Sequence, residues 1–283
     1  MIKDRDTNIV YLADKLETRH PDFFNRFTRL LNEMKIKWAL IPHTKDIWAR
    51  DFMPIQLTCG EFLQYNYRPD YLQDEQFIHL QTDLTPICEA MNLTCKKTDI
   101  IIDGGNITLC GDKVVMTDKV FTENNKEKHD QDFKKRLEEL LGHEIIIIPW
   151  HCINPEDEYA DRFGHSDGFI HCYRDNRVLM SNHRDMDAEE AKQIRNTMES
   201  VGFHVTEMLY DVENPNSDWN WAYINYLQVG KNIIMPSFGI PEDKQALSYV
   251  KDANPDCEVR QIRMRDIAAE GGALHCLTWN IRQ

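Results

Sequence analysis

Apolar residues recur at helical spacing near the start of the chain, and a β-prone stretch follows them. Four large apolar side chains would share one face of a helix, at Phe24, Phe27, Leu31 and Met34. Pro21 stands where the first turn of that helix would begin, a position that proline favours. The pattern therefore predicts a helix that is followed by a strand at residues 38–41.

The same order returns three times further along the chain. Helices are predicted at residues 132–143, 187–201 and 241–253, and strands at residues 144–150, at 203–209 and near Glu258. Asp187 and Glu190 have the spacing of a capping box, which indicates the start of the second of these helices.

Hairpins are predicted between these helix–strand pairs. Residues 168–181 and 222–236 are β-prone, with Asp175-Asn176 and Gly230-Lys231 at their turns. The coarse pattern is therefore two strands, a helix and a strand, repeated. No linker rich in proline, glycine or serine interrupts it, so we expect residues 1–283 to form a single domain.

Composition and hydropathy indicate a globular protein that does not enter a membrane. The 283 residues are 42% hydrophobic, which is enough for a substantial core. The most apolar run, residues 145–150, is far too short to span a bilayer, and the first twenty residues are charged throughout, unlike a signal peptide. We therefore expect a soluble, cytoplasmic protein.

The charge balance bears on the partners of the protein. The formal net charge is −14, and the acidic residues are spread along the chain. Such a field repels nucleic acid and acidic membranes and favours a cationic ligand, although solubility alone explains an acidic composition equally well.

Eight cysteines are present, but they do not form a metal-binding pattern. No CxxC motif occurs, and the two His-Cys pairs, His171-Cys172 and His275-Cys276, lie far apart in the sequence. We expect reduced thiols, most of them in the core, and neither a structural zinc site nor any other metal or cofactor.

Five polar residues recur at intervals of roughly 50 to 65 residues, each near the end of a predicted strand. They are Asp51, Asp103, Asp167, Asn225 and Cys276. If each belongs to one strand–strand–helix–strand unit, five such units fill the chain. Arranged around an axis, the five units would offer their polar groups to one shared centre.

Carboxylates and a thiol at one buried centre are costly unless a cation joins them. A planar guanidinium suits such a centre, because each carboxylate can accept two parallel N–H bonds from it. The sulfur of Cys276 could then attack the guanidinium carbon from above the plane. Taken singly, these stretches have simpler explanations: the DGG stretch as a turn, and the RDF stretch as a surface ion pair.

Together, four short motifs have a clear resemblance. They are Trp48-Ala49-Arg50-Asp51, Asp103-Gly104-Gly105, His165-Ser166-Asp167 and Gly271-Gly272-Ala273-Leu274-His275-Cys276. Their order resembles that of the agmatine deiminase and bacterial peptidylarginine deiminase family, within the guanidine-modifying pentein superfamily. The resemblance implies an α/β propeller of five ββαβ units around a pseudo-fivefold axis.

The resemblance also implies roles for four residues. Cys276 corresponds to the nucleophile and His165 to the general acid and base, while Asp51 and Asp167 correspond to the carboxylates that hold the guanidinium. The implied reaction is hydrolysis through a covalent thiouronium, which needs no cofactor.

Three further residues are expected at the substrate. The resemblance places Trp48 at the wall of the channel and, more loosely, Asn225 near the thiol. Asp103 matches an acidic position, although it could simply order the glycine turn.

The chain departs from the family pattern at positions that we expect to flank the pocket. Met53 replaces a glycine, Gly168 and Phe169 follow the HSD motif, and residues 278–280 read Thr-Trp-Asn in place of Thr-Gln-Gln. These departures bear on the substrate. We rank agmatine first, free arginine second and peptidylarginine third. Amidino transfer and ligand binding without turnover stay open as alternatives, as does assembly into a homodimer.

The adjacent His275 and Cys276 are not expected to act as a catalytic pair. In an extended strand their side chains would point to opposite faces, leaving His275 to pack or hydrogen-bond behind the thiol. Gly271 and Gly272 would give the backbone room to approach the site.

Overall fold

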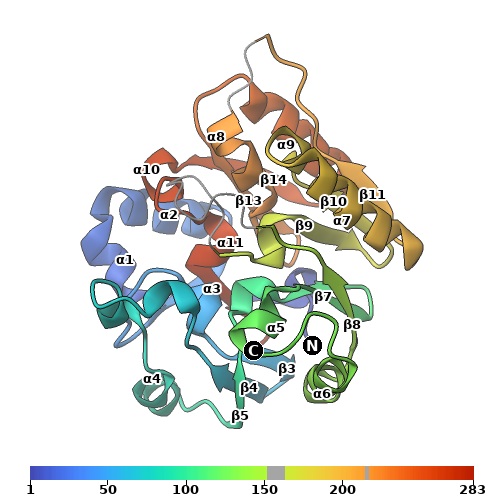
Figure 1. The fold of residues 1–283 in the computed structure, drawn as a ribbon. Helices are drawn as coiled ribbons and strands as arrows, with labels where there is room; N and C mark the ends of the chain where they lie inside the picture. The colour runs from blue at the N-terminus through green and yellow to red at the C-terminus, as the bar shows by residue number, and fades with distance from the viewer. Residues whose placement is uncertain (152–162, 214–216) are drawn as a thin grey trace.

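Five three-stranded sheets make up the computed structural model, which describes residues 1–151, 163–213 and 217–283 (Figure 1). Every sheet has the same topology. Its middle strand pairs antiparallel with one neighbour, as in a hairpin, and parallel with the other, which is reached through a helical crossover. The five ββαβ units form the α/β propeller that the sequence predicted.

The sheets are named here by their strands, with the middle strand second. They are β15 (Thr278–Ile281), β1 (Ile9–Ala13) and β2 (Lys37–Ile41); β3 (Ile55–Thr58), β4 (Glu61–Asn66) and β5 (Cys95–Ile101); β6 (Thr108–Cys110), β7 (Lys113–Thr117) and β8 (Glu144–Ile148); β9 (Ile170–Arg174), β10 (Arg177–Met180) and β11 (His204–Glu207); and β12 (Leu227–Val229), β13 (Asn232–Ser237) and β14 (Glu258–Arg263).

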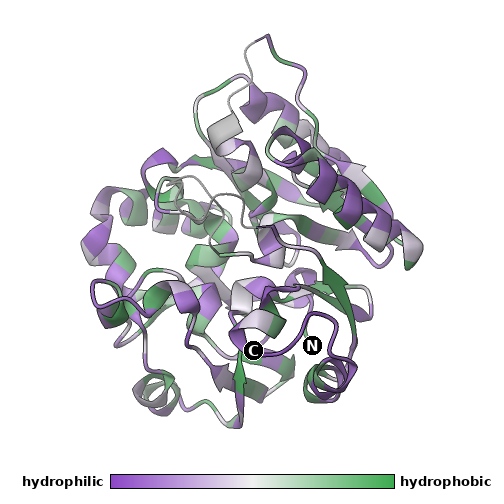
Figure 2. Ribbon diagram, in the orientation of Figure 1, coloured by the Kyte–Doolittle hydropathy of each residue, from purple (hydrophilic) through white to green (hydrophobic). Residues whose placement is uncertain are grey.

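Helices connect the second and third strands of each unit. They are α1 (Asp14–Arg19) with α2 (Pro21–Glu33), α4 (Leu84–Ala90), α5 (Lys119–Glu123) with α6 (Gln131–Leu141), α7 (Ala188–Ser200) and α9 (Glu242–Ala253). Shorter helices are α3 (Ala49–Phe52), α8 (Ser217–Asn220), α10 (Arg265–Ala268) and α11 (Leu274–Leu277). Figure 2 shows largely hydrophilic outer faces on α6, α7 and α9. No helix in the described part of the chain is both long and apolar enough to cross a membrane.

The helices that the hydrophobic pattern predicted are present. Pro21 is the first residue of α2, and all four predicted apolar side chains are buried, three of them in α2 and the fourth, Met34, directly after its last residue. At the start of α7, the Asp187 carboxylate accepts hydrogen bonds from the amides of Glu189 and Glu190. The capping box itself is incomplete, because the Asp187 amide donates to the His183 carbonyl and the Glu190 carboxylate accepts the His151 amide.

The prediction of an extended strand at His275 and Cys276 is wrong. Both residues lie in α11, and β15 begins only at Thr278. The Cys276 amide donates to the Asn225 side chain rather than to a neighbouring strand, and the Leu277 amide closes a helical turn on the Ala273 carbonyl.

The placement of the five recurring polar residues at strand ends also needs correction. Asp51 and Cys276 lie in the one-turn helices α3 and α11, Asp167 lies in the 3-10 turn Ser166–Gly168, and Asn225 ends the turn Trp221–Ile224. Asp103 follows β5 closely. What the five share is that each precedes the first strand of a unit, where the chain enters a new sheet.

The last strand of the chain closes the propeller. β15 pairs with β1, so the C-terminus completes the sheet that the N-terminus begins, and both ends lie close together (Figure 1). Trp279 of β15 is buried between Tyr11 and Phe62, with ring centroids 5.3 and 5.7 Å away. Its Nε1 donates to the Pro54 carbonyl at 2.8 Å. One indole thus joins the first and second units.

We predict that Trp279→Ala lowers the free energy of unfolding by about 3–5 kcal/mol, the usual cost of deleting a large buried aromatic side chain. Denaturant titration followed by circular dichroism measures it. Leu209→Ala serves as the control, because Leu209 is 39% exposed, and it should change stability by less than about 0.5 kcal/mol. Equal stabilities for the two variants would contradict the closing role of Trp279.

Candidate active site

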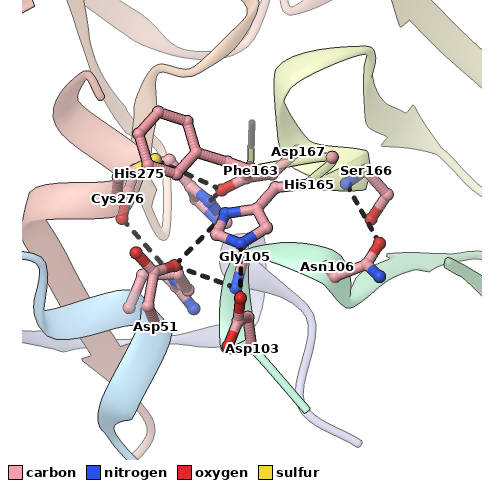
Figure 3. Close-up of polar contacts among 12 residues, drawn as sticks. Asp51, Asp103, Gly105, Asn106, Phe163, His165, Ser166, Asp167, His275 and Cys276 are labelled. Carbon is pink, nitrogen blue, oxygen red and sulfur yellow. Dashed lines mark hydrogen bonds and ion pairs between the residues drawn. The ribbon is translucent and has the colours of Figure 1, made fainter. Parts of the chain in front are cut away.

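The five recurring polar residues are all buried. Asp51 and Asp103 both contact His165 (Figure 3), and Asn225, Asp167 and Cys276 contact one another. The Asn225 side chain accepts the Cys276 amide at 3.2 Å and donates to the Asp167 carbonyl at 3.4 Å. The Cys276 Sγ lies 3.8 Å from Asp167 Oδ2. The prediction that these units contribute to a shared centre is confirmed.

His165 lies between two carboxylates. Its Nε2 is 2.9 Å from Asp103 Oδ2, and its Nδ1 is 3.5 Å from Asp51 Oδ1 (Figure 3). Burial disfavours a charged imidazole, but the charge of Asp51 and the hydrogen bond to Asp103 outweigh it and raise the pKa of His165 to about 10. His165 is therefore an imidazolium at neutral pH and can act as an acid.

Asp51 is held by the glycine turn opposite it. Its Oδ1 accepts the Gly105 amide at 3.2 Å. Burial raises the pKa of the Asp51 carboxyl to about 7, with contributions from the negative charges of Asp103 and Asp167, while His165 acts in the opposite sense. Asp51 therefore changes its protonation state near neutral pH.

Asp103 has a more definite place than ordering the glycine turn. Besides His165, its Oδ2 contacts the Tyr71 hydroxyl, which donates at 3.1 Å. The Tyr71 ring in turn packs edge-on against Phe163 at 5.0 Å. Asp103 thus fixes the His165 imidazole from the side away from Asp51.

Two glycines allow these groups to approach one another. A Cβ on Gly105 would lie 2.5 Å from His165 Nδ1 and 2.7 Å from Asp51 Oδ1. A Cβ on Gly272 would lie 2.3 Å from the Trp48 indole. The expected room at Gly272 is therefore real, and the half-buried Trp48 is the side chain that occupies it.

Gly271 is constrained both by its backbone conformation and by a neighbouring ring. Its φ of +98° lies in the region that side chains disfavour, and a Cβ there would lie 2.6 Å from the Phe163 ring. The Phe163 ring centroid lies 6.1 Å from that of the His165 imidazole. The structure thus places Trp48, Phe163 and Tyr71 around the polar groups. The role of Trp48 as a channel wall stays a prediction.

The thiol is held in its protonated form. Burial, followed by the negative charges of Asp167 and Asp51, raises the pKa of Cys276 well above its usual range. Asp167 itself stays ionised: burial opposes this, but the hydrogen bond and charge of His275 outweigh burial and lower the pKa of its carboxyl. A cation placed between the carboxylates would favour the thiolate.

Two carboxylate oxygens at this centre are buried without a hydrogen-bond partner among the described residues, Asp103 Oδ1 and Asp167 Oδ1. Buried polar atoms are nearly always satisfied in proteins. Unpaired carboxylate oxygens at this centre favour a ligand that brings N–H donors and a positive charge.

Two functional contacts were missed from the sequence. His275 Nδ1 lies 2.6 Å from Asp167 Oδ2, although His275 was expected behind the thiol without a defined partner. Arg50 of the first motif donates from Nε to the His275 carbonyl at 3.4 Å and from its terminal nitrogen to Asn280. No local pattern reveals contacts that join residues so far apart in the chain.

The residues that depart from the family pattern pack behind the site. Met53 and Trp279 are buried in one hydrophobic cluster, and Phe169 packs against His183 with ring centroids 4.9 Å apart. Asn280 donates to Asp4, Thr7 and the Gln228 carbonyl in addition to accepting from Arg50. These residues therefore contribute to the packing of the scaffold.

One group in the described part of the chain has the donor atoms for a metal ion. The ligand atoms of His151, Asp187 and Glu190 lie within 4.8 Å of one another. They are already joined by hydrogen bonds: His151 Nδ1 to Asp187 at 3.0 Å and the His151 amide to Glu190. The cluster orders the chain around the start of α7.

Comparison with known proteins extends these observations. The family described as Porphyromonas-type peptidyl-arginine deiminase matches residues 9–281. An agmatine deiminase of Pseudomonas fluorescens is 28% identical over 211 residues, which cover 63% of this chain and 56% of that protein. The match thus spans little more than half the length of that relative.

Solved structures share the fold. C. jejuni agmatine deiminase superposes with a TM-score of 0.77 at 17% identity, over 100% of this chain and 95% of that chain. DDAH from Pseudomonas aeruginosa superposes with a TM-score of 0.60 at 11% identity, over 97% of this chain and 99% of that chain.

We predict that the buried, protonated thiol of Cys276 resists alkylation at neutral pH. Its rate with iodoacetamide should rise about tenfold per pH unit up to pH 9 without a plateau, because only the thiolate reacts. Peptide mass spectrometry follows each cysteine, and the exposed Cys59 is the reference that should react faster at pH 7. A plateau for Cys276 below pH 8 would contradict the raised pKa.

Proposed function

Because this chain belongs to the Porphyromonas-type peptidyl-arginine deiminase family, we propose that it is a cysteine-dependent deiminase. It hydrolyses a guanidino compound to the ureido product and ammonia. The observation that carries the proposal is the thiol of Cys276 beside Asp167, with His165 held between Asp51 and Asp103. Ligand binding alone would require no thiol at this centre.

The geometry suits a guanidinium as substrate. The carboxylates of Asp51 and Asp167 flank the site, and Asp167 Oδ1 is free to accept an N–H bond. A planar guanidinium donates two parallel bonds to a carboxylate, which a compact ammonium cannot do. The net charge of −14 adds a field that attracts cations.

Among guanidino compounds we propose agmatine. Relatives that match the sequence are named agmatine deiminases, and agmatine carries a second cation that an acidic protein favours. Free arginine is the second candidate and peptidylarginine the third. All three compounds carry the same guanidinium, so the groups described above do not distinguish them, and the ranking depends on the distal end of the substrate.

The first half of the reaction forms a covalent bond to sulfur. The bound cation lowers the pKa of the thiol, Cys276 gives its proton to solvent, and the thiolate Sγ bonds to the guanidinium carbon as the C=N electron pair moves onto nitrogen. His165, an imidazolium at neutral pH, donates its proton to one nitrogen of the tetrahedral adduct. The C–N bond breaks, ammonia leaves, and a thiouronium stays on Cys276.

The second half returns the thiol. His165 is now neutral and takes a proton from water, whose oxygen bonds to the thiouronium carbon. Collapse of this second adduct breaks the C–S bond while the adduct hydroxyl passes its proton to the departing sulfur, which releases the ureido product and the Cys276 thiol. His165 ends protonated, as it began. Neither a metal nor an organic cofactor takes part in these steps.

Two polar residues support these reaction steps without exchanging protons themselves. Asp103 holds the His165 imidazole through Nε2, which leaves Nδ1 on the side of Asp51. Asn225 fixes the Cys276 amide and the Asp167 carbonyl, so nucleophile and carboxylate keep their relative position. Such fixed geometry lowers the barrier of the attack.

Amidino transfer is the main alternative, because an amine could replace water in the second half with the same residues. Supplying ornithine or glycine with a guanidino donor distinguishes the two. Formation of a new guanidino product in place of the ureido product would favour transfer.

We predict that the protein releases ammonia and a ureido product from agmatine more readily than from arginine or a blocked arginine peptide. Cys276→Ala should lower kcat by about 10⁴-fold or more, as expected for a lost nucleophile. Cys59→Ala is the matched control and should retain full activity, since Cys59 is exposed on the surface. Ammonia release that is equal in the parent and Cys276→Ala would contradict the mechanism.

We predict that acid below pH 7 adds a loss of about tenfold per pH unit in kcat/KM for the cationic substrate to the loss caused by protonation of the thiol, since the substrate requires Asp51 as a carboxylate. The sign follows from the pKa of Asp51, which burial raises to about 7, whereas His165 keeps its proton up to about pH 10. Initial rates between pH 5.5 and 8 test this.

Glu123→Gln is the control for this pH profile. Burial also raises the pKa of Glu123, to about 8, but Glu123 is not one of the two carboxylates that we propose to hold the guanidinium. The variant should keep the acid limb near pH 7. A flat profile in the parent, or loss of the limb in Glu123→Gln, would show that Asp51 does not control binding.

A further inference from the structure

The His275 imidazole lies between two carboxylates on the side of Asp167 away from the unpaired oxygen. Its Nδ1 is 2.6 Å from Asp167 Oδ2, a contact drawn in Figure 3, and its Nε2 is 3.4 Å from Asp4 Oδ2. His275 is buried, whereas the Asp4 side chain is 26% exposed. Both ring nitrogens therefore face an acceptor.

The backbone that carries this imidazole is held by hydrogen bonds. The His275 amide donates to the Asn225 carbonyl at 3.1 Å, and its carbonyl accepts from Arg50. Asp4 is anchored as well, because its Oδ1 accepts from Asn280 Nδ2 at 2.9 Å. The His275 backbone and the Asp4 carboxylate, which lie next to one another, are thus both held in place.

Four charged or titratable groups surround His275: Asp4, Arg50, Asp167 and His171. Burial and the charge of Arg50 disfavour the imidazolium, but the hydrogen bonds to Asp167 and Asp4 outweigh them and raise the pKa of His275. His171, with its ring centroid 6.4 Å away, has a pKa lowered to about 4, mainly by burial, and is neutral at pH 7.

A cavity of about 80 Å³ lies beside the side chains of Asp4, His275 and Asp167, under the first residues of the protein. Asp4, Arg50, Asp167, His171 and His275 contribute to its lining. It has room for several water molecules. Without the imidazole, water could therefore reach Asp167 from this side and solvate it in many orientations.

Asp167 Oδ2 contacts both His275 Nδ1 and Cys276 Sγ, while Oδ1 has no partner among the described residues. We propose that His275 is a positioning residue, which binds Oδ2 of Asp167 so that this carboxylate stays fixed beside the thiol and offers Oδ1 to the guanidinium. Asp4 orients His275 from the far side. This inference rests on the proposed deiminase function for the role of Asp167.

A purely structural histidine at this position would behave differently. It would tolerate any side chain that fills the space, and its titration would not depend on Asp167. Asparagine places an amide N–H donor near the position of Nδ1 but carries no charge, so His275→Asn retains the contact with Asp167. His275→Ala removes both the contact and the charge.

The first test needs no substrate. In ¹⁵N-histidine-labelled protein, the signals that are lost in His275→Asn belong to His275. We expect the pKa of His275 to lie above its usual range, and Asp167→Asn to lower that pKa, because the hydrogen bond to Asp167 helps to raise it. Titration near pH 6.5 in both proteins would overturn the proposal.

The second test uses the reaction. His275→Ala should lower kcat/KM by about 10²-fold, as for a misplaced reacting group, and His275→Asn should recover about tenfold of that loss. His183→Asn is the matched control, since His183 is also buried, with Nε2 2.5 Å from Glu190 Oε2. The control should retain activity, and thermal unfolding should confirm that each variant folds.

The outcomes separate the two proposals. If the parent releases no ammonia from any guanidino compound, the proposed function fails, and the histidine titration alone decides whether His275 holds Asp167. If the parent is active but His275→Ala has the same kcat/KM as the control His183→Asn, the positioning role is wrong and the proposed function stands. The same holds if His275→Asn recovers none of the kcat/KM that His275→Ala loses.

Discussion

Three carboxylates, those of Asp51, Asp103 and Asp167, are buried together at the centre of the five sheets. Each would be costly there without donors or a neighbouring positive charge. The structure supplies two imidazoles in answer: His165 lies between Asp51 and Asp103, and His275 lies between Asp167 and Asp4. The carboxylates thereby keep His165 charged, and burial together with the charges of Asp167 and Asp51 keeps the Cys276 thiol protonated. The chemistry that we propose for the site follows from this concentration of buried negative charge.

The propeller makes such a centre possible because each unit contributes one polar group at the same structural position. Every group precedes the first strand of a unit, so five turns far apart in sequence face a common axis. The closing pair β1 and β15 matters most, since it sets α11, which carries Cys276, beside α3, which carries Asp51. Glycine at positions 105 and 272 lets these turns approach within contact distance.

Much of this could be predicted from the sequence, for a physical reason. Hydrophobic periodicity repeats with each unit, so α2, α7, α9 and the order of strands were predictable, and the polar residues stood out at regular intervals. The helical turn at Cys276 was not, because the Asn225 side chain and carbonyl, supplied by another unit, bind its first amides. The partners of Asp103 and His275 were missed likewise, since each hydrogen bond joins different units.

The central claim is that Cys276 becomes covalently attached to the substrate carbon during turnover. Acid quenching of the protein during incubation with agmatine, followed by peptide mass spectrometry, tests it directly. The account predicts that the peptide containing Cys276 gains the mass of the substrate less ammonia, and that the gain disappears when substrate is exhausted. Turnover with an unmodified Cys276 peptide at every time point, or an adduct on a different residue, would contradict it.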